Sequence, residues 1–237
     1  MDIVDLEIGL SPEHAWFQSR LKLLETLSIP FFPKEGKRIL VIGAGWGEEF
    51  KIWKNWKDVL VTDKSSKAIL SPLIPHHFSR IQADALNLPF RDNYFHLLIA
   101  MDVLEHIKED KKAFEEFVRV LKPGGLMIIT VPAFPFLYSS HDRKLGHYRR
   151  YTLSTLPHSK GGKWIKKGFF GFSIFLPLII YRISRKTQPP AKLKYLSLPT
   201  WINNLLKIPL LLEAKIIKWG DFFPFGASIY AIYRKEN

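Results

Sequence analysis

The chain has 237 residues, of which 47% are hydrophobic and 24% are charged, as in ordinary globular proteins. The lack of cysteine excludes a disulfide framework, a thiolate metal site and a cysteine nucleophile. This length predicts one domain with a cap or an insertion. Because the first residues lack the basic and then apolar pattern of a signal peptide, we expect a cytoplasmic protein.

The net charge of +13 is concentrated in the C-terminal part of the chain. Residues 141–237 contain 18 Lys and Arg against four Asp and Glu, whereas residues 1–140 contain 17 against 18. A strongly basic region indicates an anionic partner, which can be a phosphate-bearing substrate, a nucleic acid or an acidic membrane surface. The alternative is a basic surface that serves only solubility.

The first predicted element is a helix over residues 11–28. Ser11 supplies its cap and Pro12 occupies its first turn. Apolar residues then recur at helical spacing up to Leu27, which predicts a helix that covers an edge of a sheet.

A buried strand and a glycine-rich turn follow. The apolar run Ile39–Ile42 predicts a strand buried on both faces, as in a parallel sheet. Three alternating glycines come next, Gly43, Gly45 and Gly47. Glycine at these positions lets a ligand approach the backbone closely. Asp63 ends the next apolar run, where a carboxylate can hold a ribose diol; a plain glycine-rich turn is the alternative.

A dinucleotide-binding fingerprint would require glycine at position 48, which is Glu48 here. The alternating glycines with Asp63 instead resemble the first motif of class I S-adenosylmethionine (SAM)-dependent methyltransferases. The segments Leu88–Phe95 and Met101–His106 are similar to later segments of that family. The resemblance implies that SAM is the cofactor and S-adenosylhomocysteine the product. It assigns the cofactor to Gly43, Ala44, Gly45, Gly47, Asp63, Lys64, Asp84, Ala85, Met101, Asp102 and His106.

The elements after Asp63 fit an α/β domain. Strands are expected at residues 81–85, 96–100 and 126–131, with an amphipathic helix at 108–121 and a turn at 122–125. The resemblance implies a Rossmann-like, seven-stranded, mostly parallel sheet in a single domain over residues 1–237. Within it we expect an N-terminal lid helix (residues 1–35), a SAM-binding core (36–152) and C-terminal strands (153–237) with a helical insertion at about 176–222.

Residues 169–181 are almost wholly apolar and are flanked by basic residues. Thirteen residues are too few to span a bilayer as a helix. They predict either a sixth strand followed by a buried helix, or a monotopic surface that dips into the membrane interface. A second apolar helical stretch covers residues 198–219, and alternating residues at 225–233 predict the last strand.

Residues 141–152 form a basic segment with three arginines and two histidines, which is a poor composition for a core. Arginines can fork onto phosphate or carboxylate, and His141 or His147 can accept a proton. A solvated basic loop is the alternative. This segment and His14–Arg20 resemble the GHxRRYT and HWWFxxR signatures of one methyltransferase subgroup. The resemblance assigns the substrate to Trp16, Arg20, Arg143, Tyr148, Arg149, Arg150 and Tyr151.

These features predict methyl transfer from SAM to an anionic small-molecule, glycan or lipid-linked acceptor, by O-methylation. We expect peripheral contact with the inner face of a membrane. The alternatives are an RNA methyltransferase and a catalytically silent SAM-binding protein. No metal is predicted, because a metal site needs two or three converging ligands and only His141, Asp142 and His147 come near such a set.

Overall fold

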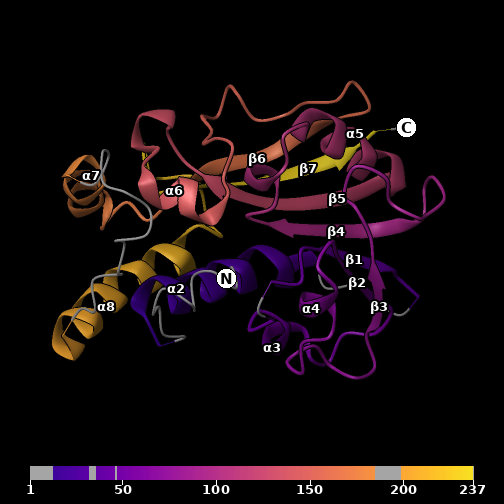
Figure 1. The fold of residues 1–237 in the computed structure, drawn as a ribbon, viewed down its shortest axis with the longest axis horizontal. Coiled ribbons are helices and arrows are strands. Elements are labelled where there is room, and N and C mark those ends of the chain that lie inside the picture. The colour runs from indigo at the N-terminus through magenta and orange to yellow at the C-terminus, as the bar shows by residue number, and fades with distance from the viewer. Residues whose placement is uncertain (1–12, 32–35, 46, 185–198, 237) are drawn as a thin grey trace.

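Short apolar runs form a seven-stranded sheet in the computed structural model, which describes residues 13–31, 36–45, 47–184 and 199–236. The strand order is β3-β2-β1-β4-β5-β7-β6 (Figure 1). The strands are β1 (Ile39–Ile42), β2 (Val59–Asp63), β3 (Ser79–Gln82), β4 (Phe95–Met101), β5 (Leu121–Pro132), β6 (Gly162–Phe170) and β7 (Ser228–Lys235). The first five strands run parallel, and β7 pairs antiparallel with both β5 and β6. The predicted Rossmann-like sheet is confirmed.

The direction of strand addition reverses between β1 and β4, which pair with each other at the centre of the parallel part. Ile42 lies in register with Thr62 on one side and with Ala100 on the other. The segments that leave β1, β2 and β4 therefore start at one edge of the sheet, where open α/β sheets bind their ligands.

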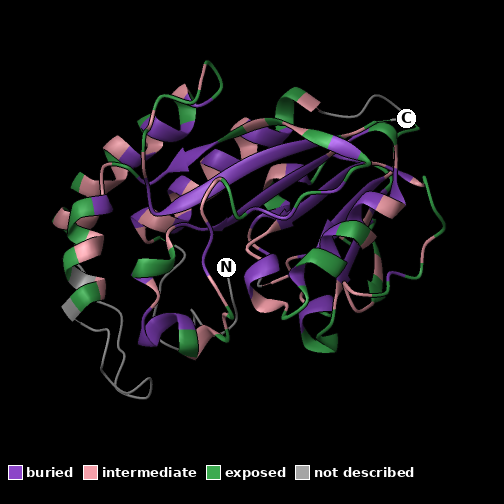
Figure 2. Cartoon of the chain, turned by 90° about the horizontal axis from the view of Figure 1, so that it is seen from above, coloured by how far each residue is buried: buried purple, intermediate pink, exposed green. Residues whose placement is uncertain are grey.

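Helices cover both faces of the sheet, which lies buried between them (Figure 2). The core of one face includes side chains of α2 (Ala15–Ser28), α3 (Phe50–Trp53), α4 (Ser66–Ile69) and α8 (Thr200–Ile216). The opposite core includes α5 (Asp110–Val120). Successive residues of β1 alternate between the two cores, because neighbouring side chains of a strand point to opposite faces.

The remaining elements are short or lie outside the two cores' main helices, and all but η1 follow β4 in sequence. They are α6 (Ser140–Leu145), α7 (Phe175–Ser184) and the short 3-10 helices η1 (Ile29–Phe31), η2 (Leu104–His106) and η3 (Pro135–Leu137). The insertion expected at about 176–222 contains α7 and α8, and both helices pack against the rest of the domain. The insertion helix α8 lies alongside the N-terminal helix α2 (Figure 1), and the Asn203 side chain accepts a hydrogen bond from the Ala15 N–H at 2.8 Å.

Several predicted boundaries differ from those in the structure. The expected start of the first helix at Ser11 and Pro12 lies outside the described residues, and the described helix begins at Ala15 with His14 as its cap. The third strand ends at Gln82 rather than at residue 85. Residues 122–125, predicted as a turn only, belong to β5, where the register with β4 shifts between Phe95 and Leu97.

Of the two alternatives for residues 169–181, the one with a buried helix is wrong. That helix is α7, and its Leu176 and Ile180 side chains are 69% and 72% exposed. Periodicity alone shows that a helix is apolar, but only the packing shows whether another layer of chain covers it.

Glu213 connects α8 to the end of β6 through hydrogen bonds. Its buried carboxylate accepts hydrogen bonds from the backbone N–H groups of Gly171 and Phe172, both at 2.9 Å, and of Ser173 at 2.6 Å. Backbone donors at the turn after β6 are thereby satisfied by one anion.

We expect Glu213→Ala to lower the free energy of unfolding by about 3 kcal/mol, because buried backbone N–H groups would lose a charged acceptor. Urea denaturation checks this. Lys215→Ala, an exposed position on the same helix, should change the free energy by less than about 0.5 kcal/mol. Equal stabilities of the two variants would contradict this role of Glu213.

Candidate active site

The loop between β1 and α3 depends on glycine for two separate reasons. Gly43, Gly45 and Gly47 have φ values of 83°, 49° and 93°, in the left-handed region that side chains disfavour. At Gly43, moreover, an added Cβ would lie 2.7 Å from Cγ2 of Val103 in the segment after β4. The glycines therefore allow the loop to turn tightly and to pack against the segment after β4 that contains Val103.

Asp63, the last residue of β2, lies beside this loop. One of its carboxylate oxygens accepts a hydrogen bond from the Ala44 N–H at 2.8 Å, and the other accepts one from the Ser65 N–H at 2.7 Å. The carboxylate and the glycine loop are thus adjacent at one edge of the sheet, in the relation that the sequence predicted. Each carboxylate oxygen keeps a further lone pair that a hydroxyl group can use.

Asp84 and its neighbours follow β3 at the same edge. The Lys64 ammonium donates a hydrogen bond to the Asp84 carboxylate at 2.9 Å, and the Leu86 N–H donates another at 3.0 Å. The bond from the Leu86 N–H and the bond from Lys64 lower the pKa of the Asp84 carboxyl. Asp84 is therefore an anion at neutral pH, and Ala85 is its neighbour in the loop.

Asp102 comes directly after β4 and has a positive φ of 51°. Its carboxylate accepts a hydrogen bond from the Thr130 hydroxyl at 3.1 Å and forms an ion pair with Arg20 of α2. A non-glycine residue in this conformation is strained, and strained residues of this kind gather at functional sites. The ion pair ties the N-terminal helix to the carboxyl edge of the sheet.

A small cavity lies between α2 and the glycine loop. It is partly open, and its volume is about 40 Å³. It is lined by Phe17, Arg20, Leu21, Leu24, Glu48, Glu49 and Met101. The lid role of the N-terminal helix stays a prediction.

The basic segment after β5 is organised around Asp142, whose side chain is wholly buried. Its carboxylate accepts hydrogen bonds from Arg150 and Arg182, both at 2.8 Å, and lies 3.2 Å from Nδ1 of His147. Although burial opposes the charge, the bond to His147 and the two guanidinium groups hold the pKa of the Asp142 carboxyl well below its usual range. Asp142 is also the third residue of α6 and completes a capping box with Ser139.

The predicted substrate residues divide into two groups. Arg150 and Tyr151 are buried, at 6% and 1% exposure, and the Tyr151 hydroxyl donates to Asp110 of α5 at 2.9 Å. Arg149 pairs with the same carboxylate. The structure therefore places Arg150 and Tyr151 in internal contacts, whereas the Arg149 side chain stays 35% exposed beside Asp110. The reason is that α5 supplies a buried acid, which the sequence pattern of the segment does not show.

The remaining predicted substrate residues lie nearer to solvent. Arg143 is exposed, and Tyr148 is 55% exposed. Trp16 stacks on Phe170 of β6 with ring centroids 5.5 Å apart, so it contributes to the contact between α2 and the sheet.

The two predicted bases differ in their surroundings. Burial, with the positive charge of Arg182, lowers the pKa of His141 to about 2, so this imidazole is neutral and a poor proton acceptor. His147 is partly exposed, and Asp142 holds its Nδ1.

Glu105 is a residue that the sequence analysis did not select. It is completely buried in η2, and burial raises the pKa of its carboxyl to about 8. Its position directly before His106 in a segment with family resemblance was a usable signal.

Comparison with known proteins agrees with this geometry. Residues 40–129 match the family described as "Methyltransferase domain". The chain is 32% identical over 148 residues to a demethylmenaquinone methyltransferase from Paenarthrobacter aurescens, which covers 59% of this chain and 56% of that protein. This chain contains a class I methyltransferase domain. The predicted family is thereby confirmed, and the subgroup stays a prediction.

Two further similarities show the range of proteins that share the methyltransferase domain. The chain is 50% identical over 52 residues to a tRNA (carboxymethyluridine(34)-5-O)-methyltransferase from Arabidopsis thaliana, which is 21% of this chain and 13% of that protein. A phosphoethanolamine N-methyltransferase 2 from Haemonchus contortus, solved with SAM, has the same fold, with a TM-score of 0.58, 20% identity and coverage of 91% of this chain and 52% of that chain. The chain spans about half or less of the length of these proteins.

We expect Asp142→Asn to lower the free energy of unfolding by about 3–5 kcal/mol, because two buried or nearly buried guanidinium groups would lose their counter-charge. Thermal and urea denaturation check this. Glu236→Gln removes an exposed acid from an ion pair with Lys163 and should change the free energy by less than about 1 kcal/mol. A loss no larger than that of Glu236→Gln would exclude Asp142 as the organising residue.

Proposed function

We propose that this protein transfers a methyl group from SAM to an acceptor. The observation that carries the proposal is the hydrogen bond between Asp63 and the Ala44 N–H, at the switch point of a methyltransferase domain. This contact brings a carboxylate suited to ribose hydroxyls against a loop that a ligand can approach closely. The neighbour solved with SAM has the same fold, which supports the choice of cofactor.

The proposed cofactor residues are those selected from the sequence. Asp63 would hold the ribose, Asp84 and Ala85 the adenine, and the glycine loop the amino-acid end of SAM. The methyl group of a sulfonium is already activated, so the protein mainly has to align the acceptor with it. For a hydroxyl acceptor a proton must also leave, and of the two predicted bases His147 is the one whose ring nitrogen lies against an orienting carboxylate.

We expect Asp63→Ala to weaken SAM binding by about 1–3 kcal/mol, the scale of a lost hydrogen bond to a buried group. Isothermal titration calorimetry measures this affinity, and S-adenosylhomocysteine serves as a second ligand. Glu236→Ala, at the opposite edge of the sheet, is the control and should leave the affinity unchanged. If Asp63→Ala also leaves it unchanged, the ribose does not lie at this carboxylate.

The acceptor proposal rests on the exposed apolar surface of α7 and α8. Leu176, Ile180 and Ile183 follow one another at helical spacing on α7, and each is more than half exposed. On α8 the exposed apolar side chains are Trp201, Leu205, Ile208 and Leu212, and Trp219 and Phe222 follow the helix. Together with those of α7 they are called the α7–α8 surface. Most protein surfaces expose only scattered apolar side chains, whereas here they are numerous and follow two helices.

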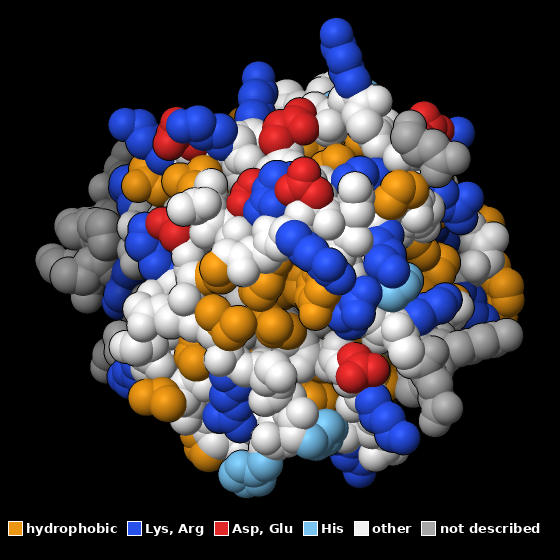
Figure 3. Space-filling view, turned by 90° about the vertical axis from the view of Figure 1, so that its right-hand side faces the viewer, with side chains coloured by type: hydrophobic (Ala, Val, Ile, Leu, Met, Phe, Trp, Pro, Cys, Tyr) orange, Lys and Arg blue, Asp and Glu red, His pale blue; other side chains and the backbone are white. Residues whose placement is uncertain are grey.

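Basic residues accompany the α7–α8 surface. Lys215 and Lys218 are exposed on or directly after α8, and the Lys218 ammonium lies 4.4 Å from the ring centre of Trp219. The face on the opposite side of the molecule carries a group of hydrophobic side chains surrounded by Lys and Arg that are interspersed with Asp and Glu (Figure 3). Apolar side chains beside lysines are the composition of a helix that lies in an anionic membrane interface.

We therefore propose that the α7–α8 surface docks on an anionic membrane and that the acceptor is an anionic, lipid-linked molecule presented there. No helix among the described residues combines the length and the apolar character needed to cross a bilayer. The two relatives named above act, by their names, on demethylmenaquinone and on a tRNA uridine. These two acceptors differ in chemistry, whereas the α7–α8 surface is a feature of this chain itself.

We expect the protein to float with phosphatidylglycerol–phosphatidylcholine vesicles and not with pure phosphatidylcholine vesicles, and salt should weaken the association. The double variant Leu205→Glu/Ile208→Glu should abolish flotation. Leu70→Glu, a 74% exposed apolar residue outside the α7–α8 surface, is the matched control and should float normally. Equal flotation of the two variants, or salt-sensitive RNA binding without vesicle binding, would overturn the membrane proposal.

A further inference from the structure

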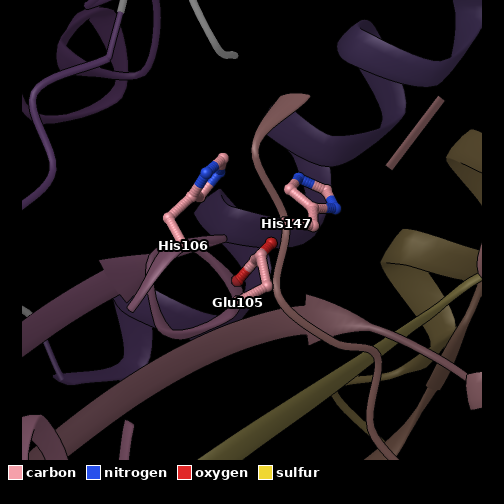
Figure 4. A group of neighbouring side chains, drawn as sticks. All are labelled: Glu105, His106 and His147. Carbon is pink, nitrogen blue, oxygen red and sulfur yellow. The ribbon is translucent and has the colours of Figure 1, made fainter. Parts of the chain in front are cut away.

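Three side chains with metal-ligating atoms converge after β4 and α6. Glu105 and His106 belong to η2, and His147 comes from the segment after α6 (Figure 4). One carboxylate oxygen and one nitrogen of each imidazole all lie within 4.8 Å of one another. Residues far apart in the sequence thus bring a carboxylate and two imidazoles together at the carboxyl edge of the sheet.

Glu105 has no counter-group of its own. Its side chain is 0% exposed, and neither carboxylate oxygen has a hydrogen-bond partner from another described residue. The guanidinium groups of Arg20 and Arg150 are engaged with Asp102 and Asp142 respectively. A buried carboxylate without a partner is costly unless it gains a proton or a cation.

The imidazoles are arranged as metal ligands usually are. The Nδ1 atom of His147 lies 3.2 Å from the Asp142 carboxylate. With the proton on Nδ1, Nε2 carries the free lone pair, as in carboxylate–histidine–metal triads. The rings of His106 and His147 meet edge to face with centroids 4.6 Å apart, and the Tyr148 N–H donates to the Glu105 carbonyl at 2.7 Å. The last bond fixes the two ligand segments to each other.

We propose that Glu105, His106 and His147 bind a divalent transition-metal ion. Two imidazoles and one carboxylate suit Zn²⁺ or Fe²⁺ and leave coordination positions open. Metal–ligand bonds of about 2.0–2.2 Å require the three side chains to draw closer together on binding. His106 is only partly buried, so its ring has room to turn toward the carboxylate, whereas the His147 side chain is 9% exposed and is oriented by Asp142.

The ligand set also indicates what the ion would do. One carboxylate and two neutral imidazoles leave a divalent ion with a net positive charge, which attracts an oxygen atom of an anionic acceptor and favours its deprotonation. This use of the metal rests on the proposed methyl transfer, whereas metal binding itself does not. His147 would then act as a ligand and not as the proton acceptor.

The test measures binding of the metal alone. We expect calorimetry on the chelator-treated full chain to show one Zn²⁺ per chain, with Co²⁺ binding in the same place and giving visible absorption. Glu105→Gln, which keeps the shape of the side chain, and His106→Ala should each weaken Zn²⁺ binding at least tenfold. Circular dichroism and thermal denaturation establish that the variants are folded.

His158→Ala is the matched control, because this exposed histidine lies outside the cluster. It should leave both the stoichiometry and the affinity for Zn²⁺ unchanged. The proposal is overturned if the wild-type chain binds no stoichiometric Zn²⁺, or if folded Glu105→Gln and His106→Ala bind it as the wild-type chain does. SAM binding, measured separately, reports on the proposed methyl transfer, so the two proposals can fail independently.

Discussion

The geometry of a parallel sheet is the constraint on which this site depends. All five parallel strands end at one edge, and the reversal of strand order between β1 and β4 separates the segments that leave them. Gly43 can follow β1 only without a side chain, because Val103 of the segment after β4 lies against it. Asp63 then closes the loop from β2 through its bond to the Ala44 N–H. The candidate cofactor site thus results from the strand order and from the close contact between Gly43 and Val103.

The buried carboxylate of Asp142 organises the basic segment after β5. Asp142 contacts His147 and Arg150 of its own segment together with Arg182 of α7. Without that carboxylate the basic side chains of the segment would have to face solvent, which is the solvated basic loop considered as the alternative in the sequence analysis. Because the charges are neutralised in pairs, the segment packs against η2 and α5 and presents His147 beside Glu105. The same network therefore links the stability of the fold to the proposed metal site.

The C-terminal helices contribute in another way. Glu213 anchors α8 to the turn after β6, and the inner side of α8 joins the core through Leu210 and Ala214. The outer side of α8, with α7, leaves a large apolar surface in contact with solvent. Folding of this chain alone does not bury that surface. A surface of this composition indicates a binding partner, and an anionic membrane is the proposed one.

The sequence by itself determined the sheet, the order of its elements and the glycine-loop and Asp63 pair, because apolar runs, alternating glycines and an acid at a strand end act through local geometry. It did not determine which charged side chains would be buried. Arg150 and Tyr151 read as substrate-binding residues, yet Asp142 and Asp110 hold them in buried contacts. The convergence of Glu105 and His147, and the exposure of α7, were likewise decided only by tertiary packing. Contacts between residues distant in sequence depend on how whole helices and strands pack together. Hydrophobic periodicity shows which face of an element is apolar, but it does not show which other element packs against that face.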